Sequence, residues 1–315
     1  MIIHKPVLLK ETIDLLDLKP GMIVIDATLG GGGHSMAILE KILPGGKLIA
    51  IDQDEKAIAG FKKTLASLKL NLKEESVRLA HNNFANLKDI VFSLKVFEVH
   101  GIVADLGISS DQLKDAKRGF SFQQNGPLDM RMNRELKMTA GDIVNTYSER
   151  RLENIFRQLG DERHAGLIAR KIVQERRRKP IQTTYELVSV IARAVPKSYQ
   201  HRKIHFATKT FQAIRMEVNQ ELENLRKFLS QAFEILKSKG RIAVISFHSG
   251  EDRLVKEIFR ENARGCICPP EFPICRCLKK PVVKIITARP IVPGKKERTE
   301  NPRSRSAKLR IAEKI

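Results

Sequence analysis

The sequence predicts an α/β protein with a parallel sheet, helices on both faces of that sheet and a helical insertion between its strands. Apolar strand-like segments alternate with helical segments over residues 1–112, a spacing typical of βαβ units. No strong strand signal occurs from about residue 113 to residue 210. We therefore expect one sheet domain, residues 1–112 and 215–315, interrupted by an inserted helical domain, residues 113–214.

The expected elements alternate in order along the first part of the chain. Strands are expected at 21–30, 45–54, 76–84 and 99–110, and helices at 35–43 and 55–68. In the insertion, the segments 149–160 and 165–179 have helical character.

The strand signals return after the insertion. One face of a predicted helix carries Val218, Leu222, Leu225, Leu229 and Leu236. Gly240 is expected to end this helix before a new strand. The last expected strand lies within 282–292, and residues 301–315 are expected to form a polar tail.

The net charge of +21 is unevenly distributed along the chain. Residues 113–214 carry +11 and residues 279–315 carry +9, whereas residues 1–112 carry −1. Two separated basic blocks favour a polyanionic partner, most often a nucleic acid, over a generic solubilising surface.

The apolar runs and the cysteines restrict the cellular setting. No apolar run approaches the length of a membrane span, and the N-terminal residues lack a signal-peptide pattern. The four cysteines crowd into residues 266–277, which excludes a disulfide framework of the secreted type. We expect a cytoplasmic protein without a membrane partner, and the sequence leaves its oligomeric state open.

Residues 24–35, VIDATLGGGGHS, place four glycines directly after an apolar run, so the backbone is expected to approach a ligand closely. A triphosphate cradle is not favoured, because His34-Ser35 stands where a P-loop has Lys-Ser/Thr. The dinucleotide fingerprint matches imperfectly because Ser35 replaces its third glycine or alanine.

Two acidic residues favour a nucleoside-type cofactor. Asp26, just ahead of the glycines, suits a ligand that carries an ammonium group, and S-adenosylmethionine is such a ligand. Asp52 closes the next predicted strand, where a carboxylate is placed to bind ribose hydroxyls.

Four further residues lie near the same predicted strand ends. Phe84 either covers an adenine or packs in the core, and Gln112 either reaches the cofactor or is an ordinary surface residue. Asp105 ends the fourth predicted strand, where an acid suits a ligand better than a core. His248 either faces the cleft or has a structural role, and the structural role is favoured.

Eight blocks carry a family resemblance, in order from His4 to Arg310. They are HKPVLLKE, DATLGGGGHS, DLGISSDQL, RGFSF, GPLDMRM, TFQAIRMEVNQEL, VISFHSGEDR and NPRSRSAKLR. Together they resemble the bacterial 16S ribosomal RNA (cytosine-N4)-methyltransferase family. The resemblance implies a Rossmann-like class I methyltransferase fold and S-adenosylmethionine as cofactor. It also implies methylation of N4 of cytidine 1402 in the decoding region, with 16S rRNA in the small ribosomal subunit or its late precursor as partner.

The resemblance also implies the residues of the site. Matched to the motifs of the family, the cofactor contacts are Gly32, Gly33, His34, Asp52, Phe84, Asp105 and Gln112. Because the N4 lone pair of cytosine is delocalised into the ring, an acceptor for the amine hydrogen is needed. Asp105 is the candidate for that catalytic role, and Ser109 and Ser110 are second choices for hydrogen bonding to the base.

An enzyme that reaches N4 needs the base out of its stack, so an aromatic platform is expected. Phe120 and Phe122 are the candidates, although packing of the insertion explains them as well. The candidate phosphate contacts are Arg118, Arg131, the run 176–179 and the basic residues within 303–310.

Cys266, Cys268, Cys275 and Cys277 form two close pairs in a proline-rich segment. Four clustered thiols suit tetrahedral zinc, but their spacing is not the common C-x-x-C, and no metal is assigned to them.

Two other functions compete with methyl transfer. A dinucleotide-dependent oxidoreductase shares the glycine turn and Asp52 but leaves the basic insertion unexplained. A non-catalytic RNA-binding module explains the charge but not a cofactor cleft.

Overall fold

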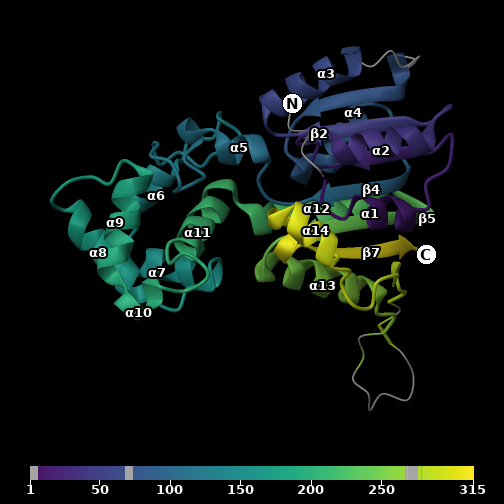
Figure 1. Ribbon diagram of the computed structural model, residues 1–315. Helices are drawn as coiled ribbons and strands as arrows, with labels where there is room; N and C mark the ends of the chain where they lie inside the picture. Colours follow the sequence, from purple (N-terminus) through teal and green to yellow (C-terminus); the bar gives the residue numbers. More distant parts are fainter. Residues whose placement is uncertain (1–5, 68–73, 267, 269–275, 278) are drawn as a thin grey trace. The chain divides into compact units, whose positions relative to one another are not determined.

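The computed structural model describes residues 6–67, 74–266, 268, 276–277 and 279–315 (Figure 1). The chain forms two compact units. The sheet unit consists of Met1–Gly107 and Leu222–Ile315, and the inserted unit is Ile108–Glu221. The insertion expected from the sequence, 113–214, falls inside the second unit, which is longer by five residues at its start and by seven at its end.

The sheet unit contains a seven-stranded sheet in the order β3-β2-β1-β4-β5-β7-β6. The strands are β1 (Ile23–Asp26), β2 (Lys47–Asp52), β3 (Val77–His81), β4 (Val99–Asp105), β5 (Leu236–Ser246), β6 (Val283–Ile285) and β7 (Lys308–Lys314). β1 to β5 pair in parallel, whereas β7 runs antiparallel to both β5 and β6. The predicted α/β class is confirmed, but the sheet is mixed and not wholly parallel.

Helices cover both faces of this sheet (Figure 1). On one face lie α1 (Leu9–Leu16), α2 (Gly33–Ile42) and α3 (Glu55–Ser67), and on the other α4 (Leu87–Ser93), α12 (Glu221–Ile235) and α13 (Ser249–Ala263). Adjacent residues of β1 enter different cores, Val24 one and Ile25 the other, because side chains alternate along a strand. A sheet buried on both faces explains the continuous apolar runs of its strands.

The prediction of a single helix across residues 218–236 is wrong. α11 (Thr208–Asn219) ends at Gln220, which has the left-handed φ of 49°, and α12 begins at Glu221. Val218 packs in the core of the inserted unit, whereas Leu225 and Leu229 pack in the sheet unit. Gly240 does not end a helix either, because β5 already begins at Leu236 and contains it.

The prediction of a polar tail at residues 301–315 is also wrong. Residues 308–314 form β7, which lies between β5 and β6 and contributes Leu309, Ile311 and Ala312 to the two cores. Arg310 is 8% exposed, and its Nε lies 2.6 Å from Asp252 Oδ1. Within the last expected strand, 282–292, only Val283–Ile285 forms a strand, β6. α14 (Lys295–Glu300) lies between β6 and β7.

The inserted unit is helical and has its own core. Its helices are α5 (Ser110–Lys114), α6 (Ala140–Thr146), α7 (Glu149–Gln158), α8 (Ala165–Arg176), α9 (Thr184–Ala194), α10 (Lys197–Gln200) and α11. Capping boxes at Thr139 and Thr183 begin α6 and α9, where each hydroxyl accepts an N–H of the first turn. Within the described residues, none of the helices is long and apolar enough to cross a membrane.

Candidate active site

The glycine turn joins β1 to α2, and two kinds of constraint require its glycines. Gly30 and Gly32 have left-handed φ values of 50° and 79°. A Cβ on Gly32 would lie 2.3 Å from Cδ2 of Phe61, and a Cβ on Gly33 would lie 2.1 Å from Cγ of Pro6. The turn is therefore held close to α3 and to the segment before α1.

Asp26, at the end of β1, is buried and committed to this turn. Its Oδ2 accepts a 2.7 Å hydrogen bond from Ser35 Oγ, and its Oδ1 accepts one of 3.1 Å from the Thr28 N–H. Burial raises the pKa of Asp26 to about 6, although both hydrogen bonds oppose the shift. The carboxyl that the sequence suggested for a ligand ammonium thus braces the strand-to-helix turn.

Asp52, at the end of β2, ties the glycine turn to the next loop. Its Oδ2 accepts the Gly30 N–H and its Oδ1 accepts the Asp54 N–H, each at 2.8 Å. Burial raises the pKa of this carboxyl. Each oxygen has a second lone pair, so the carboxylate still has capacity for ligand hydroxyls.

Asp105, at the end of β4, is the central acid of this edge. Its backbone N–H donates to Thr28 Oγ1 at 2.6 Å, which fixes the strand end against the glycine turn. Its Oδ2 lies 3.7 Å from His34 Nδ1 in the first turn of α2. Its Oδ1 is shielded from solvent and accepts no hydrogen bond from the part of the chain that the structure describes.

Two neighbouring acids and burial raise the free-energy cost of ionising Asp105. Burial is the largest cause that raises its pKa well above the usual range, and the charges of Asp26 and Glu251 add to it. Glu251, in the first turn of α13, is 2% exposed and was not found from the sequence. Its place just after β5, beside β4 in the sheet, was the available signal.

The sheet therefore brings several predicted residues to one edge. The carboxyl ends of parallel strands meet there, and they carry Asp52 and Asp105, with Gly32, Gly33 and His34 in the adjoining turn. Phe84 follows β3 in a short 3-10 turn, is half-buried and packs edge-on against Phe228 with ring centroids 5.1 Å apart.

Ser109, Ser110 and Gln112 lie in the inserted unit, just beyond the end of β4 in the chain. Ser109 caps α5, and its Oγ accepts the Gln112 N–H at 3.1 Å. The Gln112 Oε1 accepts the Ser109 N–H in return, also at 3.1 Å. The side chain proposed to reach a cofactor thus contributes its oxygen to a capping box.

His248 lies two residues after β5 and begins α13. Its Nδ1 accepts the Glu251 N–H at 3.3 Å, and its Nε2 lies 3.2 Å from Glu251 Oε1. Both contacts lie within the first turn of the helix, so the imidazole has a structural role there.

Three of the expected phosphate contacts have internal partners instead. Arg118 is 2% exposed and donates to the carbonyls of Arg131 and Met132. Arg131 forms a two-pronged ion pair with Asp129, at 2.8 and 2.9 Å. Arg310 pairs with Asp252, as described for β7. These arginines stabilise the fold and do not present their charge to a ligand.

In the run 176–179, two residues have internal partners and the two between them are exposed. Arg176 donates to the carbonyls of Val144 and Tyr147, each at 2.6 Å. Arg177 and Arg178 are exposed, and Lys179 pairs with Glu186 at 3.0 Å.

The two candidates for an aromatic platform, Phe120 and Phe122, differ in burial and in their neighbours. Phe120 is 7% exposed and packs in the core of the inserted unit, with the Arg118 guanidinium 5.6 Å from its ring. Phe122 is half-buried and stacks on His205, with centroids 4.5 Å apart and planes 21° apart.

The edge of the sheet unit fits a nucleoside cofactor. The observation is the buried Asp105 Oδ1, which a donor group of a ligand would satisfy. Asp52 supplies the acceptor that suits ribose hydroxyls at the neighbouring strand end. The turn that follows Asp26 and begins α2 contains Gly32, Gly33 and His34.

A mixed seven-stranded sheet of this order, with an antiparallel seventh strand, is typical of class I methyltransferases, and the sheet unit has that fold. The model of the MraW methylase family matches residues 1–315. The chain is 50% identical to "Ribosomal RNA small subunit methyltransferase H" of Clostridium botulinum over 99% of both chains. It is 47% identical to the protein of the same name from Halothermothrix orenii, over 100% of this chain and 99% of that one.

A solved structure of an rRNA methylase from Streptococcus thermophilus has a TM-score of 0.42 and 12% identity to this chain, over 100% of this chain and 99% of that one. The family match and the curated relatives carry the assignment: this chain belongs to the MraW methylase family. The resemblance found in the sequence is thereby confirmed, and the chain is an S-adenosylmethionine-dependent methyltransferase.

Proposed function

We propose that this enzyme transfers a methyl group from S-adenosylmethionine to N4 of cytidine 1402 in the decoding region of 16S rRNA. The substrate is the small ribosomal subunit or its late precursor, in the bacterial cytoplasm. The names of the relatives support the ribosomal substrate, and the family resemblance of the sequence blocks supports the N4 position.

One observation carries the catalytic part of the proposal: a buried carboxyl oxygen of Asp105 without a partner among the described residues. S-adenosylmethionine supplies the electrophilic methyl group when it is bound. The N4 amine is a poor nucleophile because its lone pair is delocalised into the ring. An acceptor for one amine hydrogen opposes that delocalisation, and Asp105 is placed at the end of β4 to act as this acceptor.

The turn residues have binding and positioning roles in this proposal. Gly32, Gly33 and His34 form the floor on which the cofactor lies, and Asp52 binds its ribose hydroxyls. The Nδ1 atom of His34 lies 3.7 Å from Asp105 Oδ2, so His34 lies beside the catalytic carboxyl in this proposal. Phe84, which is half-buried and packs against Phe228, lines the adenine side.

Residues at the start of the inserted unit contact the base and the cofactor in this proposal. They are Ser109, Ser110 and Gln112. The Ser109 oxygen caps α5, and its hydroxyl proton is available to donate to the base, since accepting a bond leaves the donor function intact. Ser110 is the second donor, and the Gln112 carboxamide contacts the cofactor.

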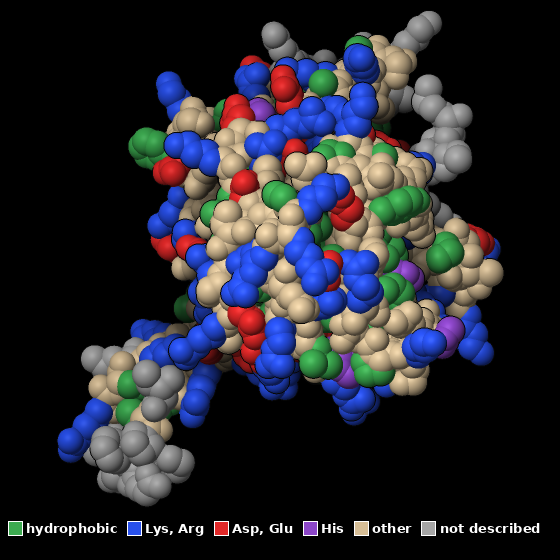
Figure 2. Space-filling model, turned by 90° about the vertical axis from the view of Figure 1, so that its left-hand side faces the viewer, with side chains coloured by type: hydrophobic (Ala, Val, Ile, Leu, Met, Phe, Trp, Pro, Cys, Tyr) green, Lys and Arg blue, Asp and Glu red, His purple; other side chains and the backbone are tan. Residues whose placement is uncertain are grey.

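The inserted unit binds the RNA backbone. Its exposed cationic side chains without an ion pair among the described residues are Lys114, Lys117, Arg134, Lys137, Arg150, Arg163, Arg177, Arg178, Lys197, Arg202 and Lys203. Figure 2 shows lysine and arginine side chains spread over the face that it presents. Such charges bind phosphates and hold the RNA, whereas contacts to the base identify the cytidine.

The test is transfer of labelled methyl groups to three substrates: whole small subunits, naked 16S rRNA and an unrelated RNA of equal length. We expect a strong preference for the assembled or partly assembled subunit. Equal methylation of all three would contradict the substrate part of the proposal. Transfer to none of them, under conditions in which S-adenosylmethionine binds, would contradict the proposal as a whole.

A further inference from the structure

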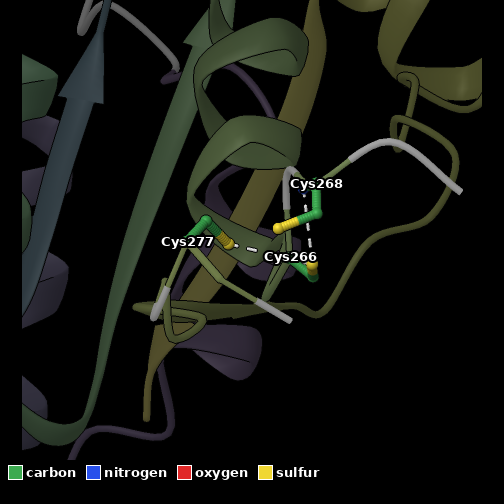
Figure 3. Close-up of side chains that lie close together, drawn as sticks. All are labelled: Cys266, Cys268 and Cys277. Atoms are coloured by element: carbon green, nitrogen blue, oxygen red, sulfur yellow. Dashed lines mark hydrogen bonds between the residues drawn. The ribbon is translucent and has the colours of Figure 1, made fainter. Parts of the chain in front are cut away.

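Three cysteine thiols converge in the segment that connects α13 to β6 (Figure 3). The Sγ atoms of Cys266, Cys268 and Cys277 all lie within 4.8 Å of one another. The Sγ atoms of Cys266 and Cys277 are 3.8 Å apart, and no disulfide joins any two of the three cysteines. A disulfide requires sulfurs about 2.05 Å apart, so the cluster consists of thiols.

The distance between the Cys266 and Cys277 sulfurs fits a tetrahedral zinc ion. Zinc lies about 2.3 Å from a cysteine sulfur, and a tetrahedral angle then places two sulfurs about 3.8 Å apart. The observed separation of Cys266 and Cys277 is 3.8 Å. The side chains approach from residues that are eleven positions apart, so a shared ion would join the two ends of the segment.

Backbone amides support negative charge on the sulfurs. The Cys268 N–H donates to Cys266 Sγ at 3.4 Å, and the Arg276 N–H donates to Cys268 Sγ at 3.3 Å. Hydrogen bonds to ligand atoms of this kind orient a metal site and stabilise the thiolate. Arg264 and Arg276, both within two residues of a proposed ligand in the sequence, add positive charge to the segment that would hold the three thiolates.

Packing of apolar side chains does not account for the convergence. Cys266 is exposed, and Cys268 and Cys277 are half-buried, so none of the three belongs to the buried cores. A metal bond stabilises small structural sites in which cysteines converge without a buried core.

We propose that Cys266, Cys268 and Cys277 bind one zinc ion and that this ion fixes the connection between α13 and β6. Soft thiolate ligands select zinc over magnesium, calcium or manganese. Each thiol loses its proton on binding, so three protons leave as the ion enters. Cys275 lies outside the described residues, and the proposed ligand set does not include it. The site is separate from methyl transfer and rests on none of the residues assigned to that reaction.

The first experiment measures zinc per chain. The protein is purified under reducing conditions, stripped with a chelator, supplied with zinc and freed of excess metal. We expect one zinc ion per chain by elemental analysis, and loss of that ion in Cys266→Ser, Cys268→Ser and Cys277→Ser. Lys280→Ser, in the same segment, is the matched control and should keep the metal. Substoichiometric uptake by the wild type, or full zinc in the serine variants, would overturn the proposal.

A second experiment needs no variant and covers the case in which a serine substitution prevents folding. Cobalt(II) replaces zinc in the wild-type protein, and thiolate ligation gives a sulfur-to-cobalt charge-transfer band. Alkylation of individual cysteines, mapped by peptide mass, is compared with and without zinc. We expect the band to appear and zinc to protect all three cysteines. Absence of the band, or equal alkylation in both samples, would contradict the site.

Discussion

Asp105 Oδ2 lies 3.7 Å from His34 Nδ1, which links the end of β4 to the first turn of α2. The Asp105 N–H also binds Thr28 Oγ1 in the glycine turn. The catalytic candidate is thus held by the same turn that forms the proposed cofactor floor. Because burial and two neighbouring acids raise its pKa, this carboxyl destabilises the fold when it is ionised. Such a cost is typical of functional groups.

Asp105→Asn should separate activity from stability. The amide keeps the shape of the side chain but accepts a hydrogen bond less strongly, so we expect methyl transfer to fall by about 100-fold or more. The free energy of unfolding at pH 8 should rise by about 1–3 kcal/mol, because a buried charge is removed. Methyl-transfer rates and urea unfolding measure the two effects.

Asp89→Asn is the control for that experiment, since Asp89 is an exposed acid on α4. It should change neither the rate nor the stability. An Asp105→Asn enzyme with wild-type activity would remove Asp105 from the mechanism.

Asp26 should make stability depend on pH in a defined window. Its pKa is about 6 in the folded protein against 3.8 for an ordinary aspartate, so the folded state binds the proton more tightly. Its stabilising contribution is fully present below about pH 4 and is lost as the pH rises through about 6. Between these limits the loss is on the order of 3 kcal/mol.

Asp26→Asn should remove this part of the pH dependence. Urea unfolding of both proteins from pH 4 to pH 7.5 measures the difference. A wild-type and variant pair with parallel pH profiles would show that burial does not perturb Asp26.

Gly32→Ala should destabilise the sheet unit by about 2–4 kcal/mol. The new methyl group would clash with the Phe61 ring, and alanine is strained at a φ of 79°. Gly60→Ala, one residue from Phe61 in α3, is the matched control because nothing lies within 4 Å of its added Cβ. Helix propensity should make that variant about 1 kcal/mol more stable. Equal thermal unfolding temperatures for the two variants would contradict the packing described for the turn.

The double variant Arg177→Gln with Arg178→Gln should weaken RNA binding only through the electrostatic contribution to the binding free energy, which depends on salt. Each lost phosphate contact lowers the slope of log affinity against log salt by about 0.7 to 0.9, so the pair should lower it by about 1.5. Affinity for S-adenosylmethionine should stay unchanged. Lys62→Gln with Lys63→Gln, on α3 of the sheet unit, is the control with equal charge loss. An equal drop in slope for both pairs would contradict assignment of RNA binding to the inserted unit.

The strand ends that hold Asp52 and Asp105 were predictable because local apolar runs define where the buried strands stop. β7 was not, since its sequence KLRIAEK is rich in charge. Arg310 and Lys308 are accommodated by Asp252 of α13, a contact between residues more than fifty positions apart. The break between α11 and α12 was not predictable either. It lies next to Asn219, whose side chain hydrogen-bonds the backbone of Met130 and Met132, far away in the sequence.

The site shows the same limit. Motifs located the glycine turn and suggested a ligand contact for Asp26, but they did not predict that each of its oxygens accepts a hydrogen bond within the turn. Glu251 reaches the environment of Asp105 only because β4 pairs with β5, with Asp105 opposite Ile245. Register between distant strands is set by packing across the whole sheet, and a local pattern does not contain it.

The most direct test of the account is the position and chemistry of the methyl group in the RNA. Small subunits from cells that lack this activity are incubated with the enzyme and S-adenosylmethionine. The 16S rRNA is then digested, and its nucleosides and fragments are analysed by mass spectrometry. The account predicts one N4-methylated cytidine, at position 1402, and its loss with Asp105→Asn. Methylation at a ring carbon, at another base or at many positions would contradict it.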